Sequence, residues 1–156
     1  MADIIFDDLS FFVNKIKKKR TDNEIVFTNG CFDLLHPGHI YILKKAKSFG
    51  DLLVVGVNSD SSVKRLKGNS RPILNERDRS ILVGALKPVD YVIIFKEATP
   101  LKTIKNLLPD VLVKGGEYSK KDIVGNQIVP RTVRIKMKTG YSTTAIIEKI
   151  KRNNFE

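Results

Sequence analysis

Residues 25–50, IVFTNGCFDLLHPGHIYILKKAKSFG, decide how this chain folds. The stretch opens with Ile25-Val26-Phe27, three apolar residues of high β-propensity that predict the first strand of an α/β unit. In the turn that follows, Gly30 lets the backbone approach a ligand closely, because it carries no Cβ. Pro37 suits the first turn of a helix, since its missing N–H would have had no partner there. The stretch therefore predicts a strand, a glycine-containing turn and a helix in direct succession.

Two histidines, His36 and His39, bracket the start of this predicted helix. A helix N-terminus presents free N–H groups and the positive end of the helix dipole, and both attract anions. Zinc binding is the alternative interpretation. A zinc helix, however, places its histidines four residues apart, and this chain has no third histidine. We therefore expect His36 and His39 to serve phosphate chemistry, where imidazoles stabilise growing negative charge.

The rest of the chain alternates between apolar segments and helical patterns. Strands are expected at 52–57, 91–95, 111–113 and 133–137, and helices at 7–20, 63–68, 76–86, from Thr99-Pro100 to Leu107, and after Gly140. In residues 76–86, Ile81, Leu82 and Ala85 are expected to share one apolar face. Such alternation predicts an α/β fold: a Rossmann-like, doubly wound parallel sheet of about five strands.

A chain of 156 residues without repeats, low-complexity tracts or linkers is expected to form one domain, residues 1–156. Within it, residues 1–23 would supply a helix and a link, and residues 24–150 the core. No apolar run approaches the roughly 18 residues of a membrane span. The first residues, MADIIFDDLSFF, are acidic where a signal peptide is basic. Together with a single cysteine, Cys31, these features predict a cytoplasmic protein that does not bind membranes.

The chain carries a formal net charge of +11, which makes nucleic acid one candidate partner. The basic residues are nevertheless spread along the sequence, and only residues 17–20 form a block. No strand carries the aromatic residues of a base-stacking platform. Cations around a polyphosphate site are the alternative explanation, and we expect no nucleic-acid partner.

Four polar segments, 30–39, 58–60, 114–118 and 140–144, each follow a predicted strand. In a parallel sheet the carboxyl ends of the strands lie at one edge, and ligands bind beyond that edge. We therefore expect the four segments to converge on one site.

The first segment, GCFDLLHPGH (30–39), resembles the GxFDxxHxGH signature of the nucleotidylyltransferase superfamily. Members of that superfamily transfer a nucleoside monophosphate from a nucleoside triphosphate to a phosphorylated acceptor. The last segment, GYSTT (140–144), is similar to the superfamily's second motif, [GS]xSTT, whose hydroxyls and helix N-terminus hold the β- and γ-phosphates. The resemblance implies that His36 and His39 contact the triphosphate and stabilise the transition state.

A closer resemblance covers residues 24–150. VKGGEY (113–118), together with NGCFDLLHPGH (29–39) and NSDSSVKRLKG (58–68), resembles the heptose 1-phosphate adenylyltransferases of lipopolysaccharide precursor synthesis. This resemblance implies the transfer of AMP from ATP to a sugar 1-phosphate, with D-glycero-β-D-manno-heptose 1-phosphate expected as the acceptor and ADP-heptose and pyrophosphate as products. Mg²⁺ would enter with ATP, and no metal ligand is assigned to the protein itself.

The same resemblance bears on the partners. ATP and a phosphorylated sugar are expected as substrates, and a homodimer as the assembly. Many heptose enzymes of this type carry a kinase domain ahead of the transferase, whereas here only a predicted helix precedes the core. We therefore expect the heptose kinase to be a separate protein.

The expected site residues fall into three groups. The catalytic group contains His36, His39 and Lys67. The nucleotide-binding group contains Asn29, Gly30, Cys31, Phe32, Gly38, Arg79, Gly115, Ser142, Thr143 and Thr144. The acceptor-binding group contains Asp33, Asn58, Asp60, Lys114 and Glu117.

Specific roles are expected for several of these residues. Lys67 would be a mobile cation for the polyphosphate, and Arg79 would contact the β- and γ-phosphates. Cys31 lacks a base of its own, so we expect its backbone N–H to face phosphate and its thiol to take no part in catalysis. Asp33 would shape its loop near the acceptor. The paired glycines at 115–116 would permit backbone contact with a base or a sugar.

The choice of nucleotide rests on residues 136–139. Glycerol- and ethanolamine-phosphate cytidylyltransferases place an arginine ahead of their GISTT-like motif, whereas this chain has Lys136-Met137-Lys138-Thr139. That difference favours ATP over CTP. Two alternatives stay open: a cytidylyltransferase for glycerol 3-phosphate or a similar alcohol phosphate, and a basic nucleotide- or nucleic-acid-binding module without turnover.

Overall fold

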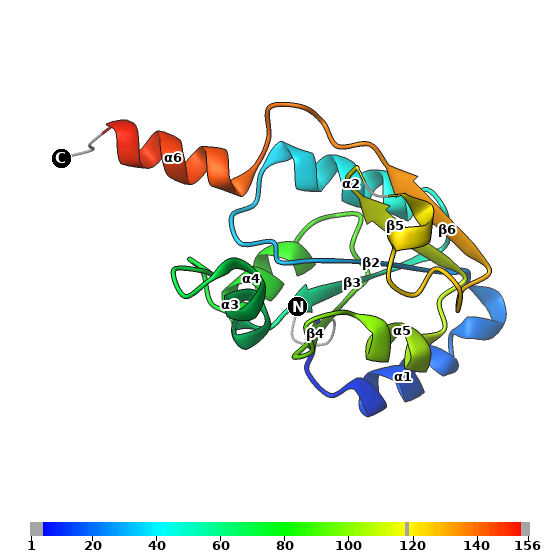
Figure 1. The fold of residues 1–156 in the computed structure, drawn as a ribbon. Coiled ribbons are helices and arrows are strands. Elements are labelled where there is room, and N and C mark those ends of the chain that lie inside the picture. Colours follow the sequence, from blue (N-terminus) through cyan, green and yellow to red (C-terminus); the bar gives the residue numbers. More distant parts are fainter. Residues whose placement is uncertain (1–4, 118, 154–156) are drawn as a thin grey trace.

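A computed structural model describes residues 5–117 and 119–153 (Figure 1). Its described part contains one parallel sheet with the strand order β1-β4-β3-β2-β5-β6. The strands are β1 Ile5–Phe6, β2 Ile25–Gly30, β3 Leu52–Asn58, β4 Tyr91–Phe95, β5 Val111–Gly115 and β6 Arg131–Ile135. The α-helices are α1 Leu9–Lys17, α2 Pro37–Lys47, α3 Asp60–Lys67, α4 Glu76–Gly84, α5 Leu101–Leu107 and α6 Thr143–Asn153, and the short 3₁₀ helices are η2 Arg20–Asp22 and η3 Lys120–Asp122.

The predicted doubly wound α/β fold is confirmed, with one strand more than expected. The additional strand, β1, has only two residues and pairs with β4 at the edge of the sheet, where Ile5 lies opposite Val92. Two residues are too few to show a sequence period, so the N-terminal segment predicted only a helix. That helix is present as α1. Pro100 is the N-cap of α5, so this helix begins at Leu101, just after the Thr99-Pro100 pair at which the sequence placed its start.

Both faces of the sheet are covered, because successive strand residues point to opposite sides. On β3, Val54 packs in a cluster with α1 and α5, while Val55 packs in a second cluster with α2 and α4. Figure 1 shows α1 beside α5 on one side of the sheet. The central strands are therefore apolar on both faces, as the unbroken apolar run of β3 predicted.

The order of the strands places a topological switch point between β2 and β5. After β2 the chain moves outward through β3 to β4, and it then returns to the other side of β2 as β5. Connections on the two sides of such a point diverge and leave a crevice at the carboxyl ends of the strands. The segment that follows β2 carries the two histidines, and Lys114 lies near the carboxyl end of β5.

Helix α4 differs from its prediction in the face that it buries. Ile81 and Leu82 are exposed, whereas Arg79, Ser80 and Val83 face inward. The apolar pattern was misleading because a buried arginine, paired with three carbonyl oxygens and a carboxylate, occupies the inner face.

Helix α6 extends away from the sheet, and none of its described residues is buried (Figure 1). No helix within 5–117 and 119–153 has the length and apolar character needed to span a bilayer.

Candidate active site

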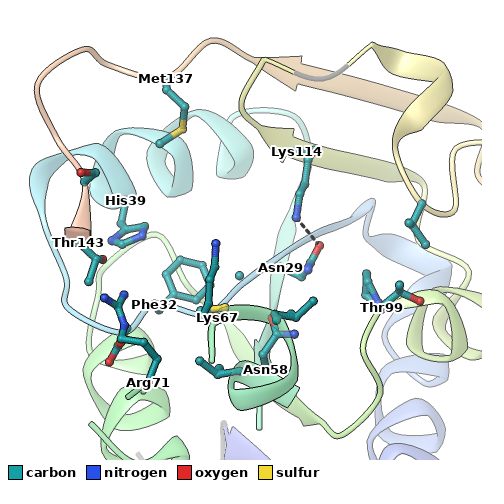
Figure 2. A pocket seen from close by; sticks show the side chains of 18 of the residues that line it. Asn29, Phe32, His39, Asn58, Lys67, Arg71, Thr99, Lys114, Met137 and Thr143 are labelled. Atoms are coloured by element: carbon teal, nitrogen blue, oxygen red, sulfur yellow. Dashed lines mark hydrogen bonds and ion pairs between the residues drawn. The ribbon is translucent and has the colours of Figure 1, made fainter. Parts of the chain in front are cut away.

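A cavity of about 660 Å³ lies at the carboxyl ends of the central strands (Figure 2). Its walls come from all four polar segments and from residues between β4 and α5. The lining residues are Asn29, Gly30, Cys31, Phe32, Asp33, His36, His39, Asn58, Val63, Leu66, Lys67, Arg71, Ala98, Thr99, Pro100, Leu112, Lys114, Asp122, Ile123, Val124, Met137, Tyr141, Ser142, Thr143 and Thr144. A volume of roughly 300–1,000 Å³ suits a nucleotide-sized ligand.

The loop between β2 and α2 is held by Phe32, whose φ of 48° lies in the left-handed region that non-glycine residues rarely adopt. Its ring is buried against His39, with 5.1 Å between the ring centroids. The same ring covers Gly30, where an added Cβ would lie 3.1 Å from Phe32 Cε2. This strained backbone therefore holds an aromatic wedge between the end of β2 and the histidine pair.

His36 is the N-cap residue of α2, and His39 lies in the first turn of the helix. Their rings are stacked, with 3.8 Å between centroids and 20° between planes. Both Nδ1 atoms are buried and have no hydrogen-bond partner in the described part of the chain. A buried polar atom without a partner is costly, so these nitrogens point to a ligand.

Burial determines the protonation of the pair. It lowers the pKa of His39 to about 4, with a smaller contribution from neighbouring His36, and it also lowers the pKa of His36. Both rings are therefore neutral at pH 7 in the free protein. A bound polyanion would favour the charged forms and raise both values.

Because the chain has only two histidines, their titration can be followed directly by NMR. We expect His39 to titrate near pH 4 and His36 below 6.5, and both midpoints to rise when tripolyphosphate is added. In urea both should return to about 6.5. Two midpoints near 6.5 in the folded protein, unmoved by tripolyphosphate, would contradict the buried, anion-facing pair.

Two lysines approach the cavity from opposite walls: Lys67 from the end of α3 and Lys114 from β5 (Figure 2). Lys114 Nζ lies 3.3 Å from Asn29 Oδ1, to which it donates. Burial lowers the pKa of Lys114, and Lys67 lowers it further. Two cations facing each other across a cavity repel, and a polyanion between them relieves that repulsion.

Cys31 lines the same cavity with a half-buried side chain. Burial raises the pKa of its thiol, although the nearby cations partly oppose this effect. A neutral thiol is a poor nucleophile, which accords with the expectation that the Cys31 thiol takes no part in catalysis.

Residues 142–144 close the cavity at the start of α6. Ser142 Oγ accepts a hydrogen bond from the N–H of Ala145 at 3.0 Å, and Thr143 Oγ1 donates to the carbonyl of Leu34 at 3.3 Å. The second contact ties α6 to the histidine loop. Two helix N-termini, those of α2 and α6, therefore meet at one cavity, an arrangement suited to an anion.

Asp33 lies in the cavity wall but is only 2% exposed. Its Oδ1 accepts from the backbone N–H groups of Ile73 at 2.7 Å and Leu74 at 3.2 Å, and its Oδ2 accepts from Arg71 Nε at 2.6 Å. Asp33 therefore shapes a loop as expected, but the loop is the one between α3 and α4. Its oxygens are committed to that loop, which argues against the expected contact with an acceptor.

In this structure Arg79 is not placed for the expected contact with the β- and γ-phosphates. The side chain is completely buried and donates to the carbonyls of Leu74, Cys31 and Asn58 and to Asp60 Oδ1, at 2.6–2.9 Å. Four of its five N–H donors are committed to the protein, which argues against contact with the β- and γ-phosphates in this arrangement. Asp60 likewise faces Arg79 and does not line the cavity, which argues against its expected contact with an acceptor.

Three further expected residues lie outside the cavity lining: Gly38, Gly115 and Glu117. A Cβ on Gly115 would lie 2.3 Å from Ile42 Cδ1, so this glycine permits close packing on α2 instead of contact with a ligand. Gly38 similarly leaves room for the His36 ring, 3.0 Å from its ideal Cβ position. Glu117 is exposed, and Tyr118 lies outside the described residues.

Sequence reasoning missed nearly half of the lining residues. Residues 98–100 follow β4, so the argument from strand ends that identified the other segments could have found them. Arg71 and residues 122–124 lie in connections without a recognisable motif, and nothing in their local sequence marks them. No group of three or more His, Cys, Asp or Glu side chains within the described ranges could hold a metal ion.

Comparisons with known proteins agree with this geometry. The family model described as cytidylyltransferase-like matches residues 27–149. Two curated relatives named "Bifunctional protein HldE" are 55% identical over 136 residues in Helicobacter pylori and 51% identical over 139 residues in Campylobacter curvus. These matches cover 87% and 89% of this chain but only 29% and 30% of the relatives, so the chain spans about three tenths of their length.

Two solved structures are similar to the chain. A lipopolysaccharide core biosynthesis protein from Thermoplasma volcanium has a TM-score of 0.64 and 35% identity, covering 74% of this chain and 98% of its own. Pantoate-beta-alanine ligase from Francisella tularensis has a TM-score of 0.66 at 16% identity, covering 97% of this chain and 78% of its own, which shows likeness of fold alone. With a family model over most of its length and relatives above 50% identity, the chain is a nucleotidyltransferase and belongs to the cytidylyltransferase-like family.

Proposed function

We propose that the chain is an adenylyltransferase that transfers AMP from ATP to a sugar 1-phosphate, D-glycero-β-D-manno-heptose 1-phosphate. The products would be ADP-heptose and pyrophosphate. One observation carries the proposal: two stacked histidines, whose Nδ1 atoms have no partner among the described residues, share a nucleotide-sized cavity with Lys67 and Lys114. A reaction between two phosphorylated substrates needs such a site, because both bring negative charge to one place.

The proposed pathway draws support from the relatives. The Thermoplasma volcanium protein bears the name of a lipopolysaccharide core biosynthesis protein, and this chain covers 98% of its length. The two curated relatives compared above, at 55% and 51% identity, are both named HldE and described as bifunctional. A homodimer and a cytoplasmic location remain predictions that accompany the proposal.

In the proposed reaction, a phosphate oxygen of the acceptor attacks the α-phosphorus of ATP in line. A new P–O bond forms while the bond from the α-phosphorus to the bridging oxygen breaks, and pyrophosphate leaves with that electron pair. Neutral His36 and His39 and the N–H groups at the start of α2 would donate hydrogen bonds to the growing charge. Lys67 and Lys114 would draw the two anions together, and no covalent intermediate with the protein is needed.

Mg²⁺ fits this site as a companion of the nucleotide. It is commonly held by substrate phosphates and water with one or two carboxylates, so the absence of a ligand cluster among the described residues is no obstacle. When bound, it would offset the charge of the phosphates. The protein's own cations and helix N-termini would orient the triphosphate.

We propose ATP over CTP as the nucleotide, because Met137 lines the cavity in the segment where glycerol- and ethanolamine-phosphate cytidylyltransferases place an arginine (Figure 2). The second candidate is a cytidylyltransferase acting on glycerol 3-phosphate or a similar alcohol phosphate. The description of the matching family model favours that alternative.

The test follows pyrophosphate release with Mg²⁺, either ATP or CTP, and either heptose 1-phosphate or glycerol 3-phosphate. We expect release only with ATP and heptose 1-phosphate, and loss of release when EDTA removes the metal. Release with CTP and glycerol 3-phosphate would instead identify the chain as the second candidate, a cytidylyltransferase. If no pair releases pyrophosphate and any DNA or RNA binds with steep salt dependence, a binding module without turnover would replace both.

A further inference from the structure

We propose that Arg71 is a phosphate-binding residue of this site, held in its binding orientation by Asp33. The proposal rests on the proposed function only in taking the ligand to be a polyphosphate. It gives the cavity a guanidinium that neither the expected Arg79 nor the segment ahead of residues 142–144 provides.

The orientation of Arg71 follows from its contacts. Its Nε donates to Asp33 Oδ2 at 2.6 Å, and the carboxylate is only 2% exposed. The backbone after Arg71 is held by the same carboxylate, through the N–H groups of Ile73 and Leu74. Arg71 is therefore fixed through both its side chain and its main chain, so little conformational freedom remains to be lost on binding.

The unused part of the guanidinium faces the cavity. Of the guanidinium nitrogens of Arg71, only Nε is paired: the two terminal nitrogens have no hydrogen-bond partner among the described residues. The side chain is 16% exposed. Figure 2 shows the guanidinium directed toward the side of the cavity where His39 and Thr143 lie. Four N–H donors in a rigid fork are thus available where the α2 and α6 termini meet.

Arg71 differs from the other cations around the cavity. The described lining contains two lysines and one arginine. A lysine is a flexible point charge, whereas a guanidinium binds two phosphate oxygens at once in a planar geometry. Arg79 is not placed for this role, because four of its five N–H donors are committed to carbonyls and Asp60.

The first test measures the binding of inorganic tripolyphosphate by calorimetry. Arg71→Lys keeps a positive charge beside Asp33 but loses the fork, and we expect binding to weaken about 10- to 100-fold while the melting temperature changes little. Arg77→Lys is the matched control, since Arg77 is exposed on α4 and lies outside the cavity lining. Unchanged tripolyphosphate binding in Arg71→Lys would overturn the proposal.

Asp33 is tested as a positioning residue by a double-mutant cycle. Asp33→Asn should weaken tripolyphosphate binding in the wild-type background but have no further effect in Arg71→Gln, because it acts through the guanidinium. In Arg71→Gln alone the buried Asp33 carboxylate would lack its counter-ion, which could unfold the protein, and the double variant removes that charge. Equal losses from Asp33→Asn in both backgrounds would show a general structural role and overturn this part of the proposal.

A measurement on the wild-type protein avoids any folding defect. Phenylglyoxal modifies accessible guanidinium groups, and mass spectrometry of peptides reports each site. We expect tripolyphosphate to protect Arg71 and to leave Arg77 reactive; equal reactivity of Arg71 with and without tripolyphosphate would contradict the inference. If tripolyphosphate protects Arg71 but no substrate pair releases pyrophosphate, the proposed function fails while the phosphate-binding role of Arg71 stands.

Discussion

Replacement of His39 by alanine is expected to lower turnover by about 10²- to 10⁴-fold while leaving the protein folded. The His39 ring is neutral at pH 7 and stacked on His36, and its Nδ1 has no partner in the described residues. No described fold contact depends on that polar atom. The loss should therefore fall on the transition state, where a donor near the α-phosphate is missing.

The measurement is the rate of pyrophosphate release at saturating substrate, together with the thermal melting temperature. Lys44→Ala is a suitable control, because Lys44 is exposed on the same helix and lies outside the cavity lining. A nucleotide affinity close to that of the wild type would assign the defect to the chemical step. Wild-type turnover in His39→Ala would remove the histidine pair from the mechanism.

Much of the fold and of this pair could be predicted because local patterns determine them. The strand, turn and helix of residues 25–47 follow from apolar β-formers, a glycine and an N1 proline. The position of the site follows from the rule that parallel strands share a carboxyl edge. Most of the expected residues that do line the cavity belong to the segments that directly follow a strand.

The parts that escaped prediction depend on contacts between distant segments. Arg79 and Arg71 lie eight positions apart in similar polar surroundings, yet one is fully buried and the other faces the cavity. The difference arises from partners brought by other elements: the carbonyls of Cys31 and Asn58 for Arg79, and the Asp33 carboxylate for Arg71. A motif can indicate that an arginine matters, but only the packed structure shows which acceptors it meets.

Replacement of Arg79 by methionine is expected to destabilise the protein by about 3–5 kcal/mol. Methionine fills much of the space but leaves the carbonyls of Leu74, Cys31 and Asn58 without a donor, and each buried unpaired carbonyl costs roughly 1–3 kcal/mol. The ion pair with Asp60 adds less, since that carboxylate is 34% exposed and can recover solvent.

Urea unfolding of Arg79→Met measures this loss, with Arg77→Met as the control, because Arg77 is exposed on the same helix and should stay within about 0.5 kcal/mol of the wild type. Cys31 and Asn58 line the cavity, so the variant should also bind nucleotide less tightly through displacement of the ends of β2 and β3. If Arg79 instead bound phosphate, the result would differ: Arg79→Met would keep the unfolding free energy of the wild type and would lose only its affinity for tripolyphosphate. That outcome would restore the role that the motif position suggested, and it would require Arg79 to leave its four acceptors when the nucleotide binds.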